Sequence, residues 1–293
     1  MGLLRVSTTS RTSASRSTRA IVPNLLIYAT CLLISFVAIG PFLWMISTSF
    51  KEPQDIITLT PSLIPDPATT ENYRYLIDNE FLPFPIFIGN SVYITVLVVV
   101  GRLLICSFAA YGFARLEFPG RDFAFGLLLA ALMVPEMLMV LPLYGTYVRL
   151  GLIDTHFPLI VPPILANTFG VFLMRQFFKT IPKEYDEAAL LDGASHFRIF
   201  ISIILPLAKP ALATLAVLTY VNIWNEFFTP LIYLSTIERF TLPVGLSFFQ
   251  SQSGSDYGPL MAGAALSMLP TLVLFVVAQR YFTSGVAMTG LKS

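Results

Sequence analysis

Polar side chains inside a long apolar segment are the first residues of this sequence that could do chemistry. The stretch YVNIWNEFFTP, residues 220–230, places amide, carboxyl, hydroxyl and indole groups in an otherwise apolar run. Helical spacing predicts one polar face made of Asn222, Asn225, Glu226 and Thr229. With Trp224 beside it, this face suits a sugar path, because polar groups pair hydroxyls and aromatic rings cover apolar ring faces. Bonding between neighbouring helices is the alternative, and it stays open.

Two charged residues also lie within apolar segments, where a charge in lipid costs about 3 kcal/mol or more. Arg102 lies near the middle of segment 88–114, and Glu136 lies in segment 122–144. Two hypotheses follow from their similar depth. The residues form a structural ion pair, or they belong to a solute pathway.

Other kinds of chemistry find little support in the sequence. His156 and His196 are isolated, and the cysteines Cys31 and Cys106 lie in apolar runs, so we expect buried thiols and no metal site. The tail GVAMTGLKS resembles a phosphate-binding loop, but Lys292 comes one position late and no helix can follow it. We therefore expect no catalytic site and no cofactor bound by this chain.

The elements that would position these groups are membrane spans. The chain of 293 residues is 55% hydrophobic and 12% charged, against about 25% charged in soluble domains. Its net charge of +1 argues against a nucleic-acid partner. Six apolar segments come near the roughly 20 residues that cross a bilayer, and they cover residues 24–49, 88–114, 122–144, 157–178, 207–235 and 260–282. Because backbone groups in lipid have no water to bond, we predict an all-α membrane protein with six transmembrane helices.

The basic residues predict the orientation of these spans. One side of the membrane would hold Arg5, Arg11, Arg16, Arg19, Arg115, Arg121, Arg175, Lys179, Lys183, Arg198, Lys209, Arg280 and Lys292. The other side would hold only Lys51, Arg74, Arg149 and Arg239. Both termini are therefore expected in the cytoplasm. Residues 1–20 would form a flexible tail, with an organelle transit peptide as the alternative, residues 21–283 the membrane domain, and residues 284–293 a second tail.

The cytoplasmic loop at about residues 179–206 contains the water-facing stretch EYDEAALLDGASHFRIFISIILP. Pro182 suits the first helical position, and acidic residues follow it where the helix dipole favours negative charge. Gly193 can end this helix in the left-handed conformation, and Ser195 can cap the next one. A helix lying on lipid would be basic and bulky, so this acidic, alanine-rich helix favours docking on a protein.

This stretch resembles the EAA signature of ABC importer permeases. Its fixed positions are Glu187, Ala188, Ala189, Gly193, Ile203, Leu205 and Pro206. The stretches NSVYITVLVVVGRLLICSFAAYGFAR, LPLYGTYVRLGLIDT, WNEFFTPLIYL and QRYFTSGVAMTGLKS resemble the shorter, six-span permease of maltose-type carbohydrate importers. The resemblance covers nearly the whole chain after about residue 20.

The resemblance implies a coupling helix between the fourth and fifth spans, which fits a groove on a cytoplasmic ATPase. Glu187 would meet a basic residue of that ATPase. The coupling residues would be Glu184, Asp186, Glu187, Ala188, Ala189, Asp192 and Gly193. The implied partners are a second permease, two ATPase subunits that hold ATP and Mg, and an extracytoplasmic solute-binding protein. The implied location is the inner or plasma membrane of a bacterium, and the implied solute is a sugar or related polyol.

The resemblance also implies a contact with the binding protein in the loop before the last span. Its residues would be Gln250, Ser253, Gly254, Ser255, Asp256 and Tyr257. The alternatives are an importer permease for amino acids or peptides, an ion-coupled secondary transporter, and a membrane scaffold without transport. The docking helix argues against the second alternative, and the polar stretch at residues 220–230 argues against the third.

Overall fold

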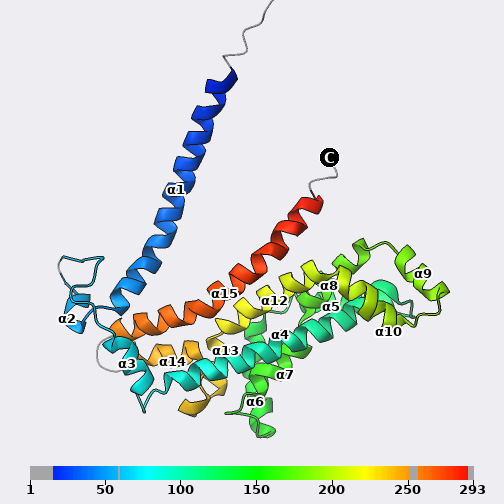
Figure 1. The fold of residues 1–293 in the computed structure, drawn as a ribbon. Helices are drawn as coiled ribbons and strands as arrows, with labels where there is room; N and C mark the ends of the chain where they lie inside the picture. The colour runs from blue at the N-terminus through cyan, green and yellow to red at the C-terminus, as the bar shows by residue number, and fades with distance from the viewer. Residues whose placement is uncertain (1–15, 59, 251–256, 290–293) are drawn as a thin grey trace, which may run out of the picture.

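The computed structural model describes residues 16–58, 60–250 and 257–289. Within these ranges the chain forms helices and turns, with no strand. The predicted all-α fold is therefore confirmed for the described part of the chain. Its longest helices are α1 (Arg16–Ser49), α4 (Phe84–Arg115) and α15 (Tyr257–Thr289), and Figure 1 shows them. α1 and α15 extend into the stretches 1–20 and 284–293, where we expected tails.

Four helical stretches are long and apolar enough to cross a membrane. They are Ile27–Ser49, Phe84–Arg115, Phe157–Thr180 and Tyr257–Gln279. The third of them comprises α7 (Phe157–Leu165) and α8 (Thr168–Thr180). Two bent pairs of helices bring the number of spans to six if each pair counts as one. The structure thus supports four to six spans among the described residues.

The predicted third span, residues 122–144, is broken into two helices. It consists of α5 (Arg121–Ala131) and α6 (Glu136–Arg149), which meet at 92°. Pro135 cannot donate a backbone hydrogen bond, and a proline disfavours helical geometry in the residue before it. These two effects separate the helices at residues 132–135 and leave Glu136 at the start of α6.

The predicted fifth span, residues 207–235, is also broken. The helical stretch His196–Leu207 contains α10 (His196–Ile199), the π-helical turn η1 (Phe200–Ile204) and α11 (Leu205–Leu207). It bends by 77° into α12 (Lys209–Trp224). A second break separates α12 from α13 (Phe228–Tyr233). Pro206 and Pro210 lack the amide hydrogens that a continuous helix would use on both sides of the bend.

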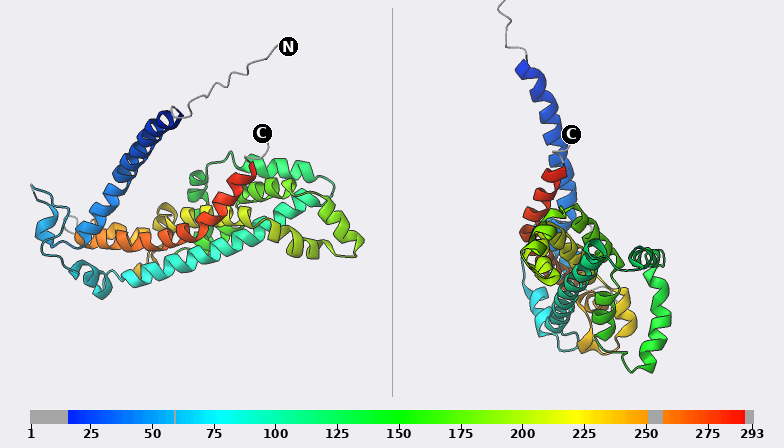
Figure 2. Two further views of the ribbon diagram at one scale, coloured as in Figure 1. Left: turned by 45° about the horizontal axis from the view of Figure 1, so that its top comes forward. Right: turned by 90° about the vertical axis from the view of Figure 1, so that its right-hand side faces the viewer.

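Helix α4, which extends along much of the molecule (Figure 2), contributes side chains to both of its hydrophobic cores. The first, here called the α14 core, includes Phe84, Phe87, Trp224 and Val244 and lies against α14 (Leu242–Phe248). The second, here called the α9 core, lies beside α9 (Glu184–Leu191) and includes Ala110, Met174, Phe178 and Ile204. α4 packs mainly on α8, α12 and α7. It therefore connects the two hydrophobic cores.

The segment after α1 has short helices of its own. They are α2 (Pro53–Ile56) and α3 (Glu71–Asp78). The buried Asn72 donates through Nδ2 to the carbonyl oxygens of Ser49 and Lys51, at 3.0 and 2.8 Å. This amide satisfies carbonyl groups at the end of α1 that have no partner within the helix. α1 itself extends away from the other helices, with its main contact on α15 (Figure 1).

Candidate functional site

A short helix, α9, lies where the sequence predicted the coupling helix. Its first turn holds Glu184, Asp186 and Glu187, and the backbone amides of Asp186 and Glu187 donate to the Lys183 carbonyl at 2.9 and 3.1 Å. The acidic side chains lie where the helix dipole favours negative charge. None of the eight residues of α9 is buried. The helix lies at one extremity of the molecule, opposite α3 (Figure 1).

Gly193 ends α9 in the conformation that the sequence predicted. Its φ is 79°, its amide donates to the Leu190 carbonyl at 3.0 Å, and the Ala194 amide donates to the Ala189 carbonyl at 2.9 Å. These two bonds form a Schellman motif, and a left-handed residue is required at its turn. An added Cβ at Gly193 would meet no atom within 4 Å. The requirement for glycine is therefore one of backbone conformation and not of space.

The chain then turns into α10, and Ser195 caps that helix as predicted. The Ser195 hydroxyl accepts a hydrogen bond from the Arg198 amide at 3.3 Å. Tyr111 of α4 donates through its hydroxyl to the His196 carbonyl at 3.2 Å. The rings of Tyr111 and Phe200 lie 5.0 Å apart. α4 thus holds the chain that follows α9 by a polar and an aromatic contact.

Asp186 differs from the other acidic residues of α9, because it faces the body of the molecule. Its Oδ2 lies 3.1 Å from Nε of Arg115, the last residue of α4, and the two side chains are 15% and 4% exposed. Glu184 and Glu187 are exposed. The sequence analysis missed this pair. The sequence shows Arg115 at the end of a predicted span, but nothing in the sequence indicates its partner.

The predicted polar face at residues 222–229 is wrong as a single helical face. α12 ends at Trp224, so Asn225 and Glu226 lie in the break that follows it, and Thr229 lies in α13. Asn225 Nδ2 donates to the Val221 carbonyl at 2.8 Å, and Glu226 Oε1 accepts from the Thr229 amide at 2.9 Å.

Two of the predicted path residues differ in their surroundings. Asn222 is exposed on the last turn of α12. Trp224 is buried, and its indole donates to the Ser267 carbonyl of α15 at 3.2 Å. Trp224 therefore bonds a neighbouring helix, as the alternative interpretation held, whereas Asn222 has an exposed side chain.

The ion pair considered for Arg102 and Glu136 is not formed. Arg102 Nε donates instead to the Pro163 carbonyl of α7 at 2.7 Å. Glu136 is exposed at the first position of α6. The hypothesis of a structural ion pair between these residues is therefore wrong. A role for them in a solute pathway stays a hypothesis.

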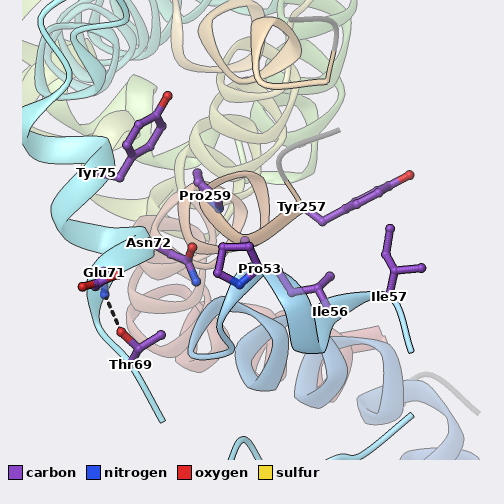
Figure 3. Close-up of a pocket in the computed structure, with 10 residues that line it drawn as sticks. Pro53, Ile56, Ile57, Thr69, Glu71, Asn72, Tyr75, Tyr257 and Pro259 are labelled. Carbon is purple, nitrogen blue, oxygen red and sulfur yellow. Dashed lines mark hydrogen bonds between the residues drawn. The ribbon is translucent and has the colours of Figure 1, made fainter. Parts of the chain in front are cut away.

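Four of the six residues expected to contact a binding protein, namely Ser253, Gly254, Ser255 and Asp256, lie outside the described residues. Gln250 and Tyr257 are described, and both are exposed. Tyr257 borders a hollow of about 280 Å³ between α2, α3 and the start of α15 (Figure 3). Pro53, Asn72 and Tyr75 also line this hollow.

A second carboxylate missed by the sequence analysis is Asp154, between α6 and α7. Its Oδ1 accepts from the amides of Ser235 and Thr236, both at 2.9 Å, and its Oδ2 accepts from the Thr236 hydroxyl. Oδ2 also pairs with Nη1 of Arg239 at 3.2 Å. Desolvation raises the pKa of Asp154, but the hydrogen bonds and Arg239 together outweigh it and lower that pKa to about 2.

The segment that Asp154 holds is also fixed to α4. Asn90 Nδ2 donates to the carbonyls of Glu238 and Phe240 at 2.9 and 3.0 Å. The hydroxyl of Ser91 accepts from the Leu242 amide at 2.7 Å. Among the described residues, no group of three or more His, Cys, Asp or Glu side chains could hold a metal ion. Asn90 and Ser91 at one end of α4 and Arg115 at the other thus bind other segments of the chain.

Residues 102–288 match the protein family described as binding-protein-dependent transport system inner membrane component. The chain is 38% identical to the arabinooligosaccharides transport system permease protein AraQ of Halalkalibacterium halodurans, over 88% of this chain and 93% of that protein. It is 32% identical to the trehalose/maltose transport system permease protein MalG of Thermococcus litoralis, over 93% of this chain and 98% of that protein.

Solved structures show the same fold. A bacterial ABC transporter involved in the import of the acidic polysaccharide alginate contains a chain with a TM-score of 0.75 and 25% identity, over 94% of this chain and all of that one. A bacterial alginate transporter in complex with an alginate pentasaccharide-bound periplasmic protein matches with a TM-score of 0.64. That second match has 17% identity and covers 90% of this chain and 96% of the other, so it supports the fold alone.

Proposed function

Since this chain belongs to the family of binding-protein-dependent transport system inner membrane components, we propose that it forms half of the translocation path for a sugar or related polyol. It is a multi-pass membrane protein. The resemblance to carbohydrate importer permeases that its sequence motifs carry is confirmed by its relatives. The named substrates of these relatives, arabinooligosaccharides and trehalose or maltose, support a carbohydrate over an amino acid or peptide.

The topology we propose has six spans, with each bent pair of helices counted as one span, and both termini in the cytoplasm of a bacterial cell. The alternation of basic residues between loops supports this orientation. Residues 21–283 then form the membrane domain, with the coupling segment at about 179–206. Residues 1–20 and 284–293 lie on the cytoplasmic side.

The observation that carries the proposed coupling role is the exposed α9 at one extremity of the molecule. Glu184, Glu187, Ala188 and Asp192 have exposed side chains that an ATPase groove could contact. Ala189 is half-buried and packs on the α9 core. The Schellman turn at Gly193 keeps the helix short and directs the chain back into the membrane domain.

The partners follow from the family. A second permease would complete the path, two ATPase subunits would hold ATP and Mg, and a solute-binding protein would deliver the sugar outside. The chain itself then has no ATPase site. The loop from Gln250 to Tyr257 would contact the binding protein, and the break at residues 225–227, with Asn222 and Thr229 beside it, would line the path.

Co-purification and transport measurements test this function. The chain would be purified in mild detergent with its associated proteins, and the complex would be reconstituted into vesicles that contain ATP. We expect an ATPase and a second permease to co-purify, and uptake of a labelled oligosaccharide only with ATP and a binding protein. A chain that purifies alone, or uptake driven by an ion gradient without ATP, would contradict the proposal and favour a secondary transporter.

A further inference from the structure

We propose that the ion pair between Arg115 and Asp186, whose side chains are largely shielded from solvent, transmits displacement of α9 to α4, and that Asp186 acts inside the chain rather than on the ATPase surface. This inference rests on the proposed function, because it takes α9 as the coupling helix. It assigns Asp186 and Arg115 as positioning residues for coupled transport. Neither would touch solute or nucleotide.

The contacts of Arg115 show that it holds α9 from two directions. Its Nε lies 3.1 Å from Asp186 Oδ2, and its Nη2 donates to the Ile181 carbonyl at 2.7 Å. Ile181 precedes α9, whereas Asp186 lies in its first turn. One guanidinium therefore connects the last residue of α4 to both the entry and the body of the coupling helix.

Few other contacts attach α9 to the molecule. Its main contact with another helix is with α10, which follows it in the chain. On the inward side, Ala189 comes one helical turn after Asp186 and packs on the α9 core. A methyl group can slide on apolar neighbours, whereas a buried charge cannot leave its partner without a large electrostatic cost. The ion pair is therefore the contact that obliges α4 to follow α9.

α4 is suited to pass such a displacement along the molecule. It extends from Arg115 through both cores to Asn90 and Ser91, which bond the backbone of residues 238–242. A helix is stiff along its axis, because each turn is hydrogen-bonded to the next. A shift at Arg115 would thus reach the segment that α4 and Asp154 hold at the opposite end.

The geometry of the pair also allows it to tighten. Asp186 Oδ1 is buried without a hydrogen-bond partner, and Arg115 Nε is not aligned with Oδ2 as a hydrogen bond requires. A guanidinium and a carboxylate bind most strongly through two parallel hydrogen bonds. A small movement of α9 toward α4 would bring the second carboxylate oxygen onto the guanidinium, so the pair would hold throughout the movement.

The test is a charge exchange in the complete complex, reconstituted into vesicles with its binding protein. The variants are Arg115→Asp, Asp186→Arg and the double exchange, with Arg121→Gln as the control because Arg121 pairs mainly with its neighbour Asp122. The measurements are co-purification of the ATPase, ATP hydrolysis, and the number of ATP molecules hydrolysed per solute imported. We expect each single change to lower uptake at least tenfold, and the double exchange to recover at least a third of it. The control should stay within twofold of the unaltered complex.

Two results would overturn the inference. Uptake by Arg115→Asp within twofold of the unaltered complex would show that the pair is dispensable. A double exchange no better than the single changes would show that the residues do not act as a pair. Where Arg115→Asp fails to fold, Arg115→Gln is measured instead, since it keeps a donor for the Ile181 carbonyl and removes the charge. Failure of the unaltered chain to co-purify with an ATPase would contradict the proposed function, a result distinct from these two.

Discussion

The two ends of α4 hold neighbouring segments in different ways. Near its start, the segment at residues 235–242 is bonded to Asp154, Asn90 and Ser91 through amides, carbonyls and one arginine. At its other end, α9 has no buried residue and depends on Arg115 for its strongest polar contact.

This difference indicates which of the two segments can be displaced more easily. A carboxylate that accepts several hydrogen bonds from one segment fixes that segment in a single arrangement. A helix with few buried contacts can be displaced at low free-energy cost. In the coupling role that we propose, the segment at Asp154 would be a rigid platform that moves with α4 as one body, while α9 would be the movable contact for a partner.

Removing the carboxylate of Asp154 gives the largest expected effect. Asp154→Ala leaves the amides of Ser235 and Thr236 without their acceptor, and hydrogen bonds to charged groups contribute about 1.5–3 kcal/mol each. We expect a loss of about 3 kcal/mol in the free energy of unfolding, measured by thermal denaturation of the purified chain in detergent. Asp78→Ala is the control, because its pair with Arg74 is exposed, and it should change stability by less than about 0.5 kcal/mol. Equal losses in the two variants would contradict the rigid-platform interpretation.

Replacing Gly193 tests the turn that ends α9. Gly193→Val forces a β-branched residue to a φ of 79°, which costs about 1–2 kcal/mol. We expect faster hydrogen exchange at residues 189–196 and a loss of coupled uptake. Gly193→Asn should retain most of the uptake, because asparagine tolerates this conformation.

Gly112→Ala is a second control for that turn. Gly112 also has no atom within 4 Å of an added Cβ, but its φ is not positive. Normal uptake and unchanged exchange with Gly193→Val would show that the Schellman turn has no role in coupling.

Acid should weaken the Asp154 platform in a defined pH range. The pKa of Asp154 is lowered from 3.8 to about 2 in the folded chain, so the folded state binds its proton less readily than the unfolded state does. Its contribution is therefore complete above pH 3.8 and is lost as the pH falls toward 2. After allowance for solvent screening, we expect this contribution to be about 1–2 kcal/mol.

The measurement compares unaltered protein with Asp154→Asn between pH 6 and about pH 2.5. The difference in stability between them should shrink below about pH 4. A difference that grows on acidification would contradict the assigned direction of the pKa shift.

The smallest effect is expected from the cap of α10. Ser195→Ala removes the acceptor of the Arg198 amide, and loss of such a cap costs about 1 kcal/mol. We expect slightly faster hydrogen exchange at residues 196–199 with little change in global unfolding. Ser202→Ala, an exposed position on the same helical stretch, should leave that exchange unchanged. Identical exchange in both variants would mean that Ser195 is not an effective cap.

The features that the sequence predicted correctly are local ones. Gly193 and Ser195 end and begin helices as expected, because left-handed turns and caps involve residues two to five positions apart. Four apolar spans were likewise predicted near their observed bounds, since a run of about 20 apolar residues has few other stable arrangements.

The polar stretch at residues 220–230 shows where such reasoning failed. Residue types and helical spacing predicted a continuous face, but α12 ends at Trp224. Trp224 is buried against Ser267 of α15, and Glu226 bonds the amide of Thr229. Helical periodicity locates residues only as long as the helix continues, and the spacing of residue types does not show where the helix ends.

The sequence by itself thus determined the all-helical membrane character of this chain, its family signature and the local turns around α9. Only the tertiary structure decided that Asp186 faces Arg115 while Glu187 faces outward, and that Asp154 holds a segment about eighty residues away in the chain. The physical reason is that apolar runs, turns and caps depend on residues that are neighbours in the chain. The partner of a buried charge is set by how distant helices pack.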